Sequence, residues 1–163
     1  MRRILPALGV FLLLAIPAQL FAKAKTDKIT ITGAGLKVPI EITDPNIVSS
    51  FQVWSGAGTS ADAQPRSFIV DWSKGQAAEP PKGLPRYEVS FWAKLSEERV
   101  VYVVQYEYDP ATNTGYVYLP GPGEKWYRLD CSSICRDVEG EWFHAWSEWD
   151  KVAGPLLADH AGR

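Results

Sequence analysis

The chain has 163 residues, with 17 lysines and arginines against 19 aspartates and glutamates, and a formal net charge of −2. This length suits one domain with a core of its own. Because the charge is slightly negative and no basic cluster occurs, a nucleic-acid partner or an acidic membrane surface is not expected.

The N-terminus has the layout of a secretory signal peptide. Two arginines precede an apolar run over residues 4–18, and the sequence AKA at residues 22–24 fits a small-x-small cleavage site. The run is short for a bilayer span and contains two prolines. We expect residues 1–24 to be removed on export. Residues 25–163 then form a single β-rich domain in the periplasm or outside the cell, without a membrane span, and the loss of three basic residues makes its charge −5.

Two short strands are predicted at the start of the exported part. Residues 28–32, KITIT, alternate apolar and polar side chains, and residues 38–43 do the same after a glycine-containing turn. Period two around a turn predicts a β-hairpin. Pro39 has no N–H to donate to a neighbouring strand, so the second strand should lie at an edge or a bulge.

A short helix and two long loops are expected next. The aspartate–proline pair at residues 44–45 is typical of a helix start and predicts a helix near residues 45–52. Glycine, proline and serine are frequent in residues 55–66 and 73–85, on either side of a short strand over residues 67–72. Loops of this length are often functional or disordered, and the sequence leaves both roles open.

The middle of the chain predicts an antiparallel meander. Residues 86–94, 99–109 and 115–119 alternate apolar and polar side chains and are joined by turn-forming residues, including the run DPATNTG. A further strand is expected over residues 126–130. These strands indicate a mainly β (α+β) fold, with an antiparallel sheet or a sandwich-like arrangement.

Large apolar residues near the C-terminus recur in steps of four, three, three and four: Trp142, Trp146, Trp149, Val152 and Leu156. This spacing places them on one face of a helix. We therefore predict a C-terminal helix near residues 142–153, which Pro155 should end.

The chain contains seven tryptophans and seven tyrosines. On the strand over residues 99–109, Tyr102, Tyr106 and Tyr108 share a face with valines, whereas the opposite face carries Gln105 and Glu107. The tyrosine face is therefore the predicted core face.

Aromatic rings can also form a platform for sugars, because each ring offers an apolar face with polar edges. The candidate binding residues are Tyr108, Tyr116, Tyr118 and Trp126. The expected partner is a cell-wall or extracellular polysaccharide, including peptidoglycan, or another exported protein. The preferred function is a non-catalytic binding or envelope-associated domain.

Catalytic residues are not predicted, because the sequence lacks the nucleophile elbow GxSxG and the metalloprotease motif HExxH. Its histidines are His144 and His160. Glu107 and Asp109 share a strand face, and such a pair could serve a retaining glycosidase. A small carboxylate-dependent hydrolase therefore stays an alternative, as does a protein-interaction or inhibitor domain.

No cofactor is expected, although the acidic run DVEGE offers one alternative. Asp137, Glu139 and Glu141 provide the hard oxygen ligands that calcium prefers. The run does not follow the calcium-loop motif, so a solvated acidic turn is the favoured interpretation.

The two cysteines of the chain, Cys131 and Cys135, lie in the sequence CSSIC. This spacing resembles the copper-binding loop of cytochrome oxidase subunit II, but Glu139 and Trp142 stand where that loop needs a histidine and a methionine. Zinc needs further ligands, of which His144 could be a third. Because export favours oxidation, we predict a local disulfide between the cysteines, with free thiols as the alternative.

Two stretches, ITGAGLKVPIEITDP and GYVYLPGPGEKWYRL, resemble segments of a family of short secreted bacterial proteins with no established function. The resemblance covers the N-terminal hairpin and the central meander. It implies a single exported domain and carries no functional residue.

Overall fold

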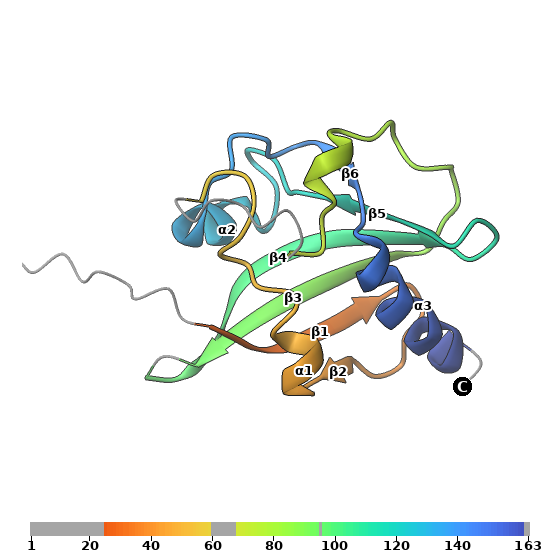
Figure 1. Ribbon diagram of the computed structural model, residues 1–163, viewed down its shortest axis with the longest axis horizontal. Helices are drawn as coiled ribbons and strands as arrows, with labels where there is room; N and C mark the ends of the chain where they lie inside the picture. The colour runs from red at the N-terminus through yellow and green to blue at the C-terminus, as the bar shows by residue number, and fades with distance from the viewer. Residues whose placement is uncertain (1–24, 60–67, 95, 162–163) are drawn as a thin grey trace, which may run out of the picture.

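A computed structural model describes residues 25–59, 68–94 and 96–161, so the predicted signal peptide over residues 1–24 lies outside the described part. Six strands form one antiparallel sheet in the order β2-β1-β3-β4-β5-β6 (Figure 1). The strands are β1 (Thr26–Gly33), β2 (Ile40–Ile42), β3 (Arg86–Lys94), β4 (Glu98–Asp109), β5 (Thr114–Tyr118) and β6 (Trp142–His144). The mainly β fold class is confirmed.

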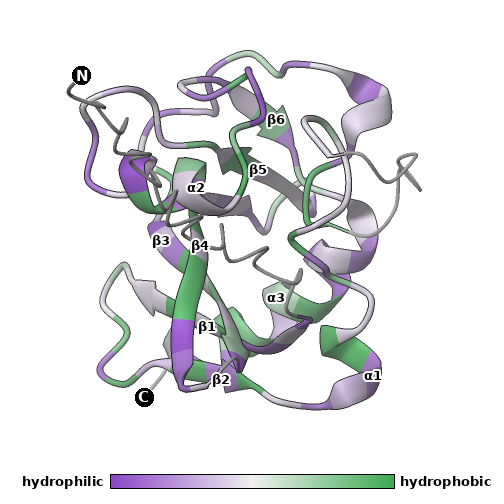
Figure 2. Cartoon of the chain, turned by 90° about the vertical axis from the view of Figure 1, so that its left-hand side faces the viewer, coloured by the Kyte–Doolittle hydropathy of each residue, from purple (hydrophilic) through white to green (hydrophobic). Residues whose placement is uncertain are grey.

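The helices are short except for the last. They are α1 (Pro45–Val48), the 3-10 helix η1 (Trp72–Lys74), α2 (Tyr127–Ser133) and α3 (Ser147–Ala161). Both α1 and α3 lie on the same side of the sheet in the two overall views (Figures 1 and 2). Within the described residues, no helix combines the length and apolarity needed to cross a membrane.

The core lies between the sheet and this helical side. Tyr102 and Tyr106 of β4 are fully buried there, which confirms that the tyrosine face is the core face. The ring of Tyr106 meets Trp149 of α3 edge-on at 6.0 Å between centroids, and Trp149 meets Phe51 at 5.1 Å. Aromatic packing therefore joins α3, the segment after α1 and the middle of the sheet.

The opposite side of strands β3 to β6, which we call the outer face, carries a different set of residues. They alternate with the core residues along each strand: Arg86, Glu88, Gln105, Glu107, Tyr116, Tyr118, Trp142 and His144. Most are half-buried or exposed, whereas Glu107 is buried.

The N-terminal hairpin and the meander follow the sequence-based predictions. β1 pairs with β2, and β2 begins directly after Pro39 at the edge of the sheet. β3, β4 and β5 pair in sequence order, as the meander requires. The predicted helix near residues 45–52 is correctly placed but shorter: Asp44 caps α1 by accepting the Asn46 N–H, and α1 ends at Val48.

Two strand predictions are wrong. Trp126 is the N-cap of α2 and residues 127–130 form its first turn, from which Asp130 is buried against β4. A five-residue pattern is too short to separate a period of two from a period of 3.6. Of the strand expected over residues 67–72, the described part contains a single bridge from Val70 to Ala145, followed by η1.

The C-terminal helix begins later than predicted. Trp142 belongs to β6, and α3 starts at Ser147. Pro155 lies inside α3 instead of ending it. The apolar steps from Trp146 onward do follow the helix, but Trp142 extends this spacing from a strand, where its ring contacts Tyr118.

Candidate binding face

Strand register aligns two rows of side chains across the outer face. In the first row, Arg86 is opposite Glu107, Glu107 is opposite Tyr116, and Tyr116 is opposite His144. The rings of Tyr116 and His144 have centroids 5.5 Å apart. Four strands thus bring a cation, a carboxylate and two aromatic rings into one line.

The second row runs beside the first. It consists of Glu88, Gln105, Tyr118 and Trp142, again opposite one another on neighbouring strands. The rings of Tyr118 and Trp142 have centroids 5.0 Å apart. Burial, together with a hydrogen bond to Glu124, raises the pKa of Tyr118, so its hydroxyl stays protonated at neutral pH.

Charge on this face is concentrated between Arg86 and Glu107. Arg86 Nε donates to Glu107 Oε1 at 2.7 Å, and the guanidinium carbon of Arg86 lies 5.5 Å from the centre of the Trp142 ring. The Glu107 side chain is 6% exposed and the Arg86 side chain 57% exposed. The carboxylate is thus held inside the fold, while the guanidinium reaches from it towards solvent.

A cavity of about 300 Å³ adjoins this ion pair. Its walls are the segment Glu79 to Leu84 together with Arg86 and Glu107. Two residues before the segment, the Ala77 N–H donates to the Trp142 carbonyl of β6, and the segment ends two residues before β3. Part of the long loop over residues 73–85 therefore builds a wall of the cavity.

The four predicted binding residues do not share one surface. Tyr116 and Tyr118 lie together on the outer face. Trp126 lies just before α2, and Lys125, whose Nζ is 4.3 Å from the centre of the Trp126 ring, also reaches Glu88 on that face. Tyr108 lies on the core face instead, where its ring stacks near Tyr106 and its hydroxyl contacts Asn113.

The other candidates are dispersed. Asp109 accepts hydrogen bonds from Ala111 and Thr112, so its carboxylate closes the hairpin turn and is not a wall of the cavity. His144 is on the outer face, and His160 lies in the last turn of α3. The structure therefore places Glu107 and His144 on one face, and directs Asp109 to the turn.

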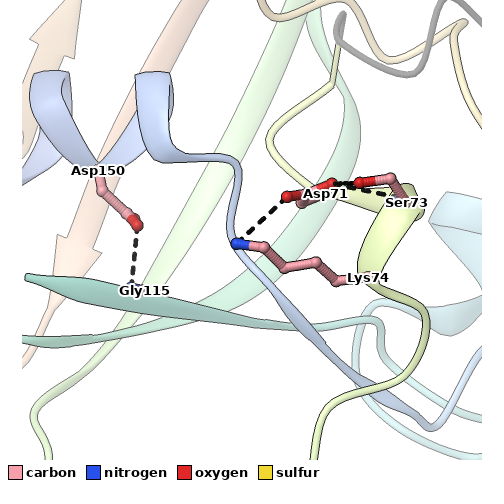
Figure 3. Close-up of polar contacts among 5 residues, drawn as sticks. All are labelled: Asp71, Ser73, Lys74, Gly115 and Asp150. Carbon is pink, nitrogen blue, oxygen red and sulfur yellow. Dashed lines mark hydrogen bonds and ion pairs between the residues drawn. The ribbon is translucent and has the colours of Figure 1, made fainter.

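A buried carboxylate ties α3 to the sheet. Asp150 reaches from α3 to β5, as Figure 3 shows, and accepts from the Gly115 N–H at 3.0 Å and the Tyr106 hydroxyl at 2.7 Å. Burial raises the pKa of Asp150 to about 6, although both hydrogen bonds and the charge of Lys74 act to lower it. Lys74 pairs with Asp71 at 3.3 Å on a neighbouring segment. The two hydrogen bonds of Asp150 dock α3 on the core side of the sheet, away from the outer face.

The sequence CSSIC spans the end of α2, and its two sulfur atoms lie 2.09 Å apart, at disulfide distance. Charged residues flank the pair on both sides and point into the core. Asp130, just before Cys131, is fully buried and accepts from the Val103 N–H at 2.8 Å. Burial raises the pKa of Asp130 to about 8, although the Val103 hydrogen bond and the Arg136 charge lower it.

Arg136, just after Cys135, is the second flanking charge and is 2% exposed. Its guanidinium donates to the carbonyls of Val53, Ser55 and Ala57 and to the hydroxyl of Tyr102. The same guanidinium lies within 4.6 to 5.3 Å of three ring centres, those of Phe68, Tyr102 and Trp72. Arg136 thus fixes the chain after α2 to the segment that follows α1.

Residues with metal-binding atoms meet at one place in the described part of the chain. Ligand atoms of Cys131, Cys135 and Glu139 all lie within 4.8 Å of one another. The Glu139 carboxylate accepts the backbone N–H groups of Arg136 and Val138. Asp137 and Glu141, the other residues of the alternative calcium group, do not belong to this cluster, and the solvated acidic turn stays a prediction.

Sequence reasoning did not identify Arg86, Trp142 or the cavity wall as parts of a site. Arg86 could have been found, because it alternates with Tyr87 and therefore has to face away from the core. The spacing of Trp142 from Trp146 and Trp149 predicts a helix, and a helical Trp142 would not lie beside Tyr118. The cavity wall is irregular chain, and its position depends on tertiary contacts with β6 and β3.

Comparisons of the chain with protein-family models, with curated proteins and with solved structures give no match. The resemblance to short secreted bacterial proteins therefore stays a prediction. The functional argument depends on the geometry of the chain itself.

Proposed function

We propose that the chain is an exported, non-catalytic binding domain whose outer face holds a carbohydrate chain. The observation that carries this proposal is the two-row arrangement of rings and charges beside a cavity. Tyr118 and Trp142 provide adjacent rings in the second row, and Arg86 and Glu107 provide a charged donor and a charged acceptor in the first row.

The chemistry of the face matches that of a sugar. The faces of a pyranose carry C–H groups that pack on aromatic rings, while its hydroxyl groups accept from guanidinium groups and donate to carboxylates. Ligand cavities commonly combine ring walls with a few such polar groups, and about 300 Å³ is at the small end of their range. The cavity would hold one sugar unit of the chain beside Glu107, and the rings would carry its neighbours.

The location of the face supports a binding role. Since α1 and α3 pack on the opposite side of the sheet, ligand binding at the outer face needs no movement of the core (Figure 2). Hydrolysis is less well supported, because Asp109 is directed to the hairpin turn and Glu107 is paired with Arg86. A protein partner on this face is the remaining alternative.

The test is a binding assay with insoluble polysaccharides, including peptidoglycan, cellulose, chitin and xylan. Tyr118→Ala and Trp142→Ala should each weaken binding at least about tenfold, which corresponds to ~1.4 kcal/mol for the loss of a stacked ring. Tyr108→Ala is the matched control, because that ring lies on the core face. Near-ultraviolet circular dichroism checks that each variant stays folded.

Two results would contradict the proposal. One is a wild-type chain that binds none of the polysaccharides. The other is binding that survives Tyr118→Ala and Trp142→Ala unchanged. Arg86→Gln and Glu107→Gln then separate a ligand held by rings alone from one that also needs the charged pair.

A further inference from the structure

We propose that reduction of the Cys131–Cys135 pair creates a binding site for a zinc-like divalent cation, with Glu139 as the third ligand. This inference does not depend on the proposed function of the outer face. It starts from the cluster in which both sulfur atoms and a Glu139 carboxylate oxygen lie within 4.8 Å of one another. Within the described residues, no other group of three such ligands occurs.

The donor types select the cation. Two thiolates and one carboxylate suit a borderline-soft ion such as Zn²⁺, which binds cysteine sulfur at ~2.3 Å and carboxylate oxygen at ~2.0–2.2 Å. Calcium prefers six to eight oxygen ligands and is a poor match for sulfur. A water molecule would complete a tetrahedral zinc site with three protein ligands.

Glu139 is held in a fixed orientation without using its full capacity as an acceptor. One carboxylate oxygen accepts the Arg136 N–H and the other accepts the Val138 N–H, at 3.1 Å for the latter. Each oxygen keeps a second lone pair for a cation. Backbone donors of this kind orient a ligand in the way that outer hydrogen bonds orient the ligands of known metal sites.

The loop that carries the ligands is anchored by contacts other than the disulfide. On one side, Asp130 accepts from the Val103 N–H, and on the other, Arg136 donates to three carbonyls and to Tyr102. Ile134, between the cysteines, is also buried. These contacts keep both ends of CSSIC in place when the bond between the sulfur atoms is broken.

The site is accessible to a reductant and to a cation. Cys135 is exposed and Cys131 is half-buried. A dithiol reductant supplies two electrons and two protons: it becomes a cyclic disulfide, and the two cysteines become thiols. The cation then displaces a proton from each thiol to solvent, and the sulfur atoms move apart to the ~3.8 Å that two thiolates adopt around tetrahedral zinc.

The sequence had suggested His144 as a third zinc ligand. The structure places His144 on the outer face, where its ring contacts Tyr116, and brings Glu139 to the cysteines instead. Glu139 is also the central residue of the acidic run that the sequence offers as an alternative calcium group. The structure thus assigns this glutamate to a sulfur-containing cluster.

The experiment uses the full exported chain, reduced with dithiothreitol, desalted without oxygen and titrated with Zn²⁺ against a chromophoric chelator. Native mass spectrometry counts the bound ions, and Co²⁺ substitution reports sulfur ligation by its charge-transfer band. We expect one zinc ion per reduced chain, none per oxidised chain, and none in Cys131→Ser. Glu139→Gln should weaken zinc binding at least about tenfold, whereas the matched control Glu141→Gln should leave it unchanged.

Three outcomes would overturn the inference. The first is a reduced wild-type chain that binds zinc no better than Cys131→Ser. The second is equal affinity in Glu139→Gln and Glu141→Gln, which would remove Glu139 as a ligand. The third is loss of the near-ultraviolet dichroism on reduction, because the site requires Asp130 and Arg136 to keep the loop folded.

Discussion

Arg136 brings a positive charge into the core, where its side chain is 2% exposed and its guanidinium donates to four oxygens. Three of those oxygens are backbone carbonyls of residues 53–57. A buried carbonyl that loses its hydrogen-bond donor destabilises the fold, because its desolvation is no longer offset by a hydrogen bond. One side chain therefore holds together two segments that lie far apart in the sequence.

We predict that Arg136→Ala lowers the free energy of unfolding by about 3–5 kcal/mol, because it leaves buried carbonyls unpaired and empties the space between three rings. Arg136→Lys should retain only part of the stability, since an ammonium group cannot reproduce the planar set of N–H donors of the guanidinium. Urea unfolding measures both changes. Arg128→Ala, a change at an exposed position in α2, should stay within about 0.5 kcal/mol of wild type. Equal effects of Arg136→Ala and Arg128→Ala would refute this role.

Asp130 makes stability depend on pH. Its carboxyl group has a pKa of about 8 in the fold, raised from the ordinary value of 3.8 chiefly by burial. Between pH 3.8 and about 8, Asp130 is more protonated in the folded chain than in the unfolded chain. The contribution of Asp130 is therefore most favourable at low pH and is lost as the pH rises towards about 8.

We predict a fall in the free energy of unfolding of about 2 kcal/mol between about pH 6.5 and 8, from the linkage relation of ~1.4 kcal/mol per pH unit. Asp130→Asn keeps an acceptor for the Val103 N–H but cannot ionise, so its stability should be flat in that interval. Asp150 does not interfere, because its pKa of about 6 places most of its titration below the interval. A wild-type slope that persists in Asp130→Asn would show that another group is responsible. Urea midpoints across the interval provide the measurement.

At the scale of secondary structure, α3 is docked on the sheet through one backbone position. Gly115 of β5 lies so close to α3 that a Cβ atom there would be 2.1 Å from Asp150 Oδ1 and 2.6 Å from the Tyr106 ring. Both neighbours belong to the buried network shown in part in Figure 3. Only glycine allows strand and helix to approach this closely.

We predict that Gly115→Ala destabilises the fold by about 1–3 kcal/mol through overpacking. The neighbouring change Thr114→Ala, at a half-buried position, provides the comparison and should cost less. The free energy of unfolding from urea titration measures both. If Gly115→Ala were as stable as wild type, the close approach of α3 to β5 would be wrong.

At the scale of the whole molecule, the first testable feature is the mature chain itself. The N-terminal sequence predicts cleavage after Ala24, so exported protein should begin at Lys25. Intact-mass spectrometry should give a chain that is two hydrogens lighter than the reduced form and that resists alkylation until a reductant is added. A mass that includes residues 1–24 would contradict cleavage, and alkylation without reductant would contradict the disulfide.

Several elements were predictable from sequence because their information is local. The alternation of residues in β1, β3, β4 and β5 requires a core face and an outer face, whatever those strands pair with. Pro39 excludes a central position for the strand that follows it. Asp44 and Pro45 define the start of α1 through a cap and a preset backbone angle.

The candidate site was only partly predictable. Tyr116 and Tyr118 could be placed on one face from their spacing, but the ring beside Tyr118 belongs to Trp142, more than twenty residues later. Trp142 fits a helical spacing with Trp146 and Trp149, so the sequence alone favoured the wrong element. Pairing with β5 determines that Trp142 lies in a strand. A strand at the edge of β5 satisfies backbone N–H and C=O groups that would otherwise be left unpaired.

The sequence by itself determined the mainly β class, the meander and the core face of the tyrosines, and it favoured a pairing of the two cysteines while leaving free thiols open. Each of these depends on residue type and on spacing within a few neighbours. The tertiary structure alone decided that Arg86, Glu107 and Trp142 meet beside a cavity, that Glu139 joins the cysteines, and that Asp130 and Arg136 are buried. The first contact joins residues from separate strands, the Glu139 contact depends on how the chain turns after α2, and burial is set by the packing of the whole fold.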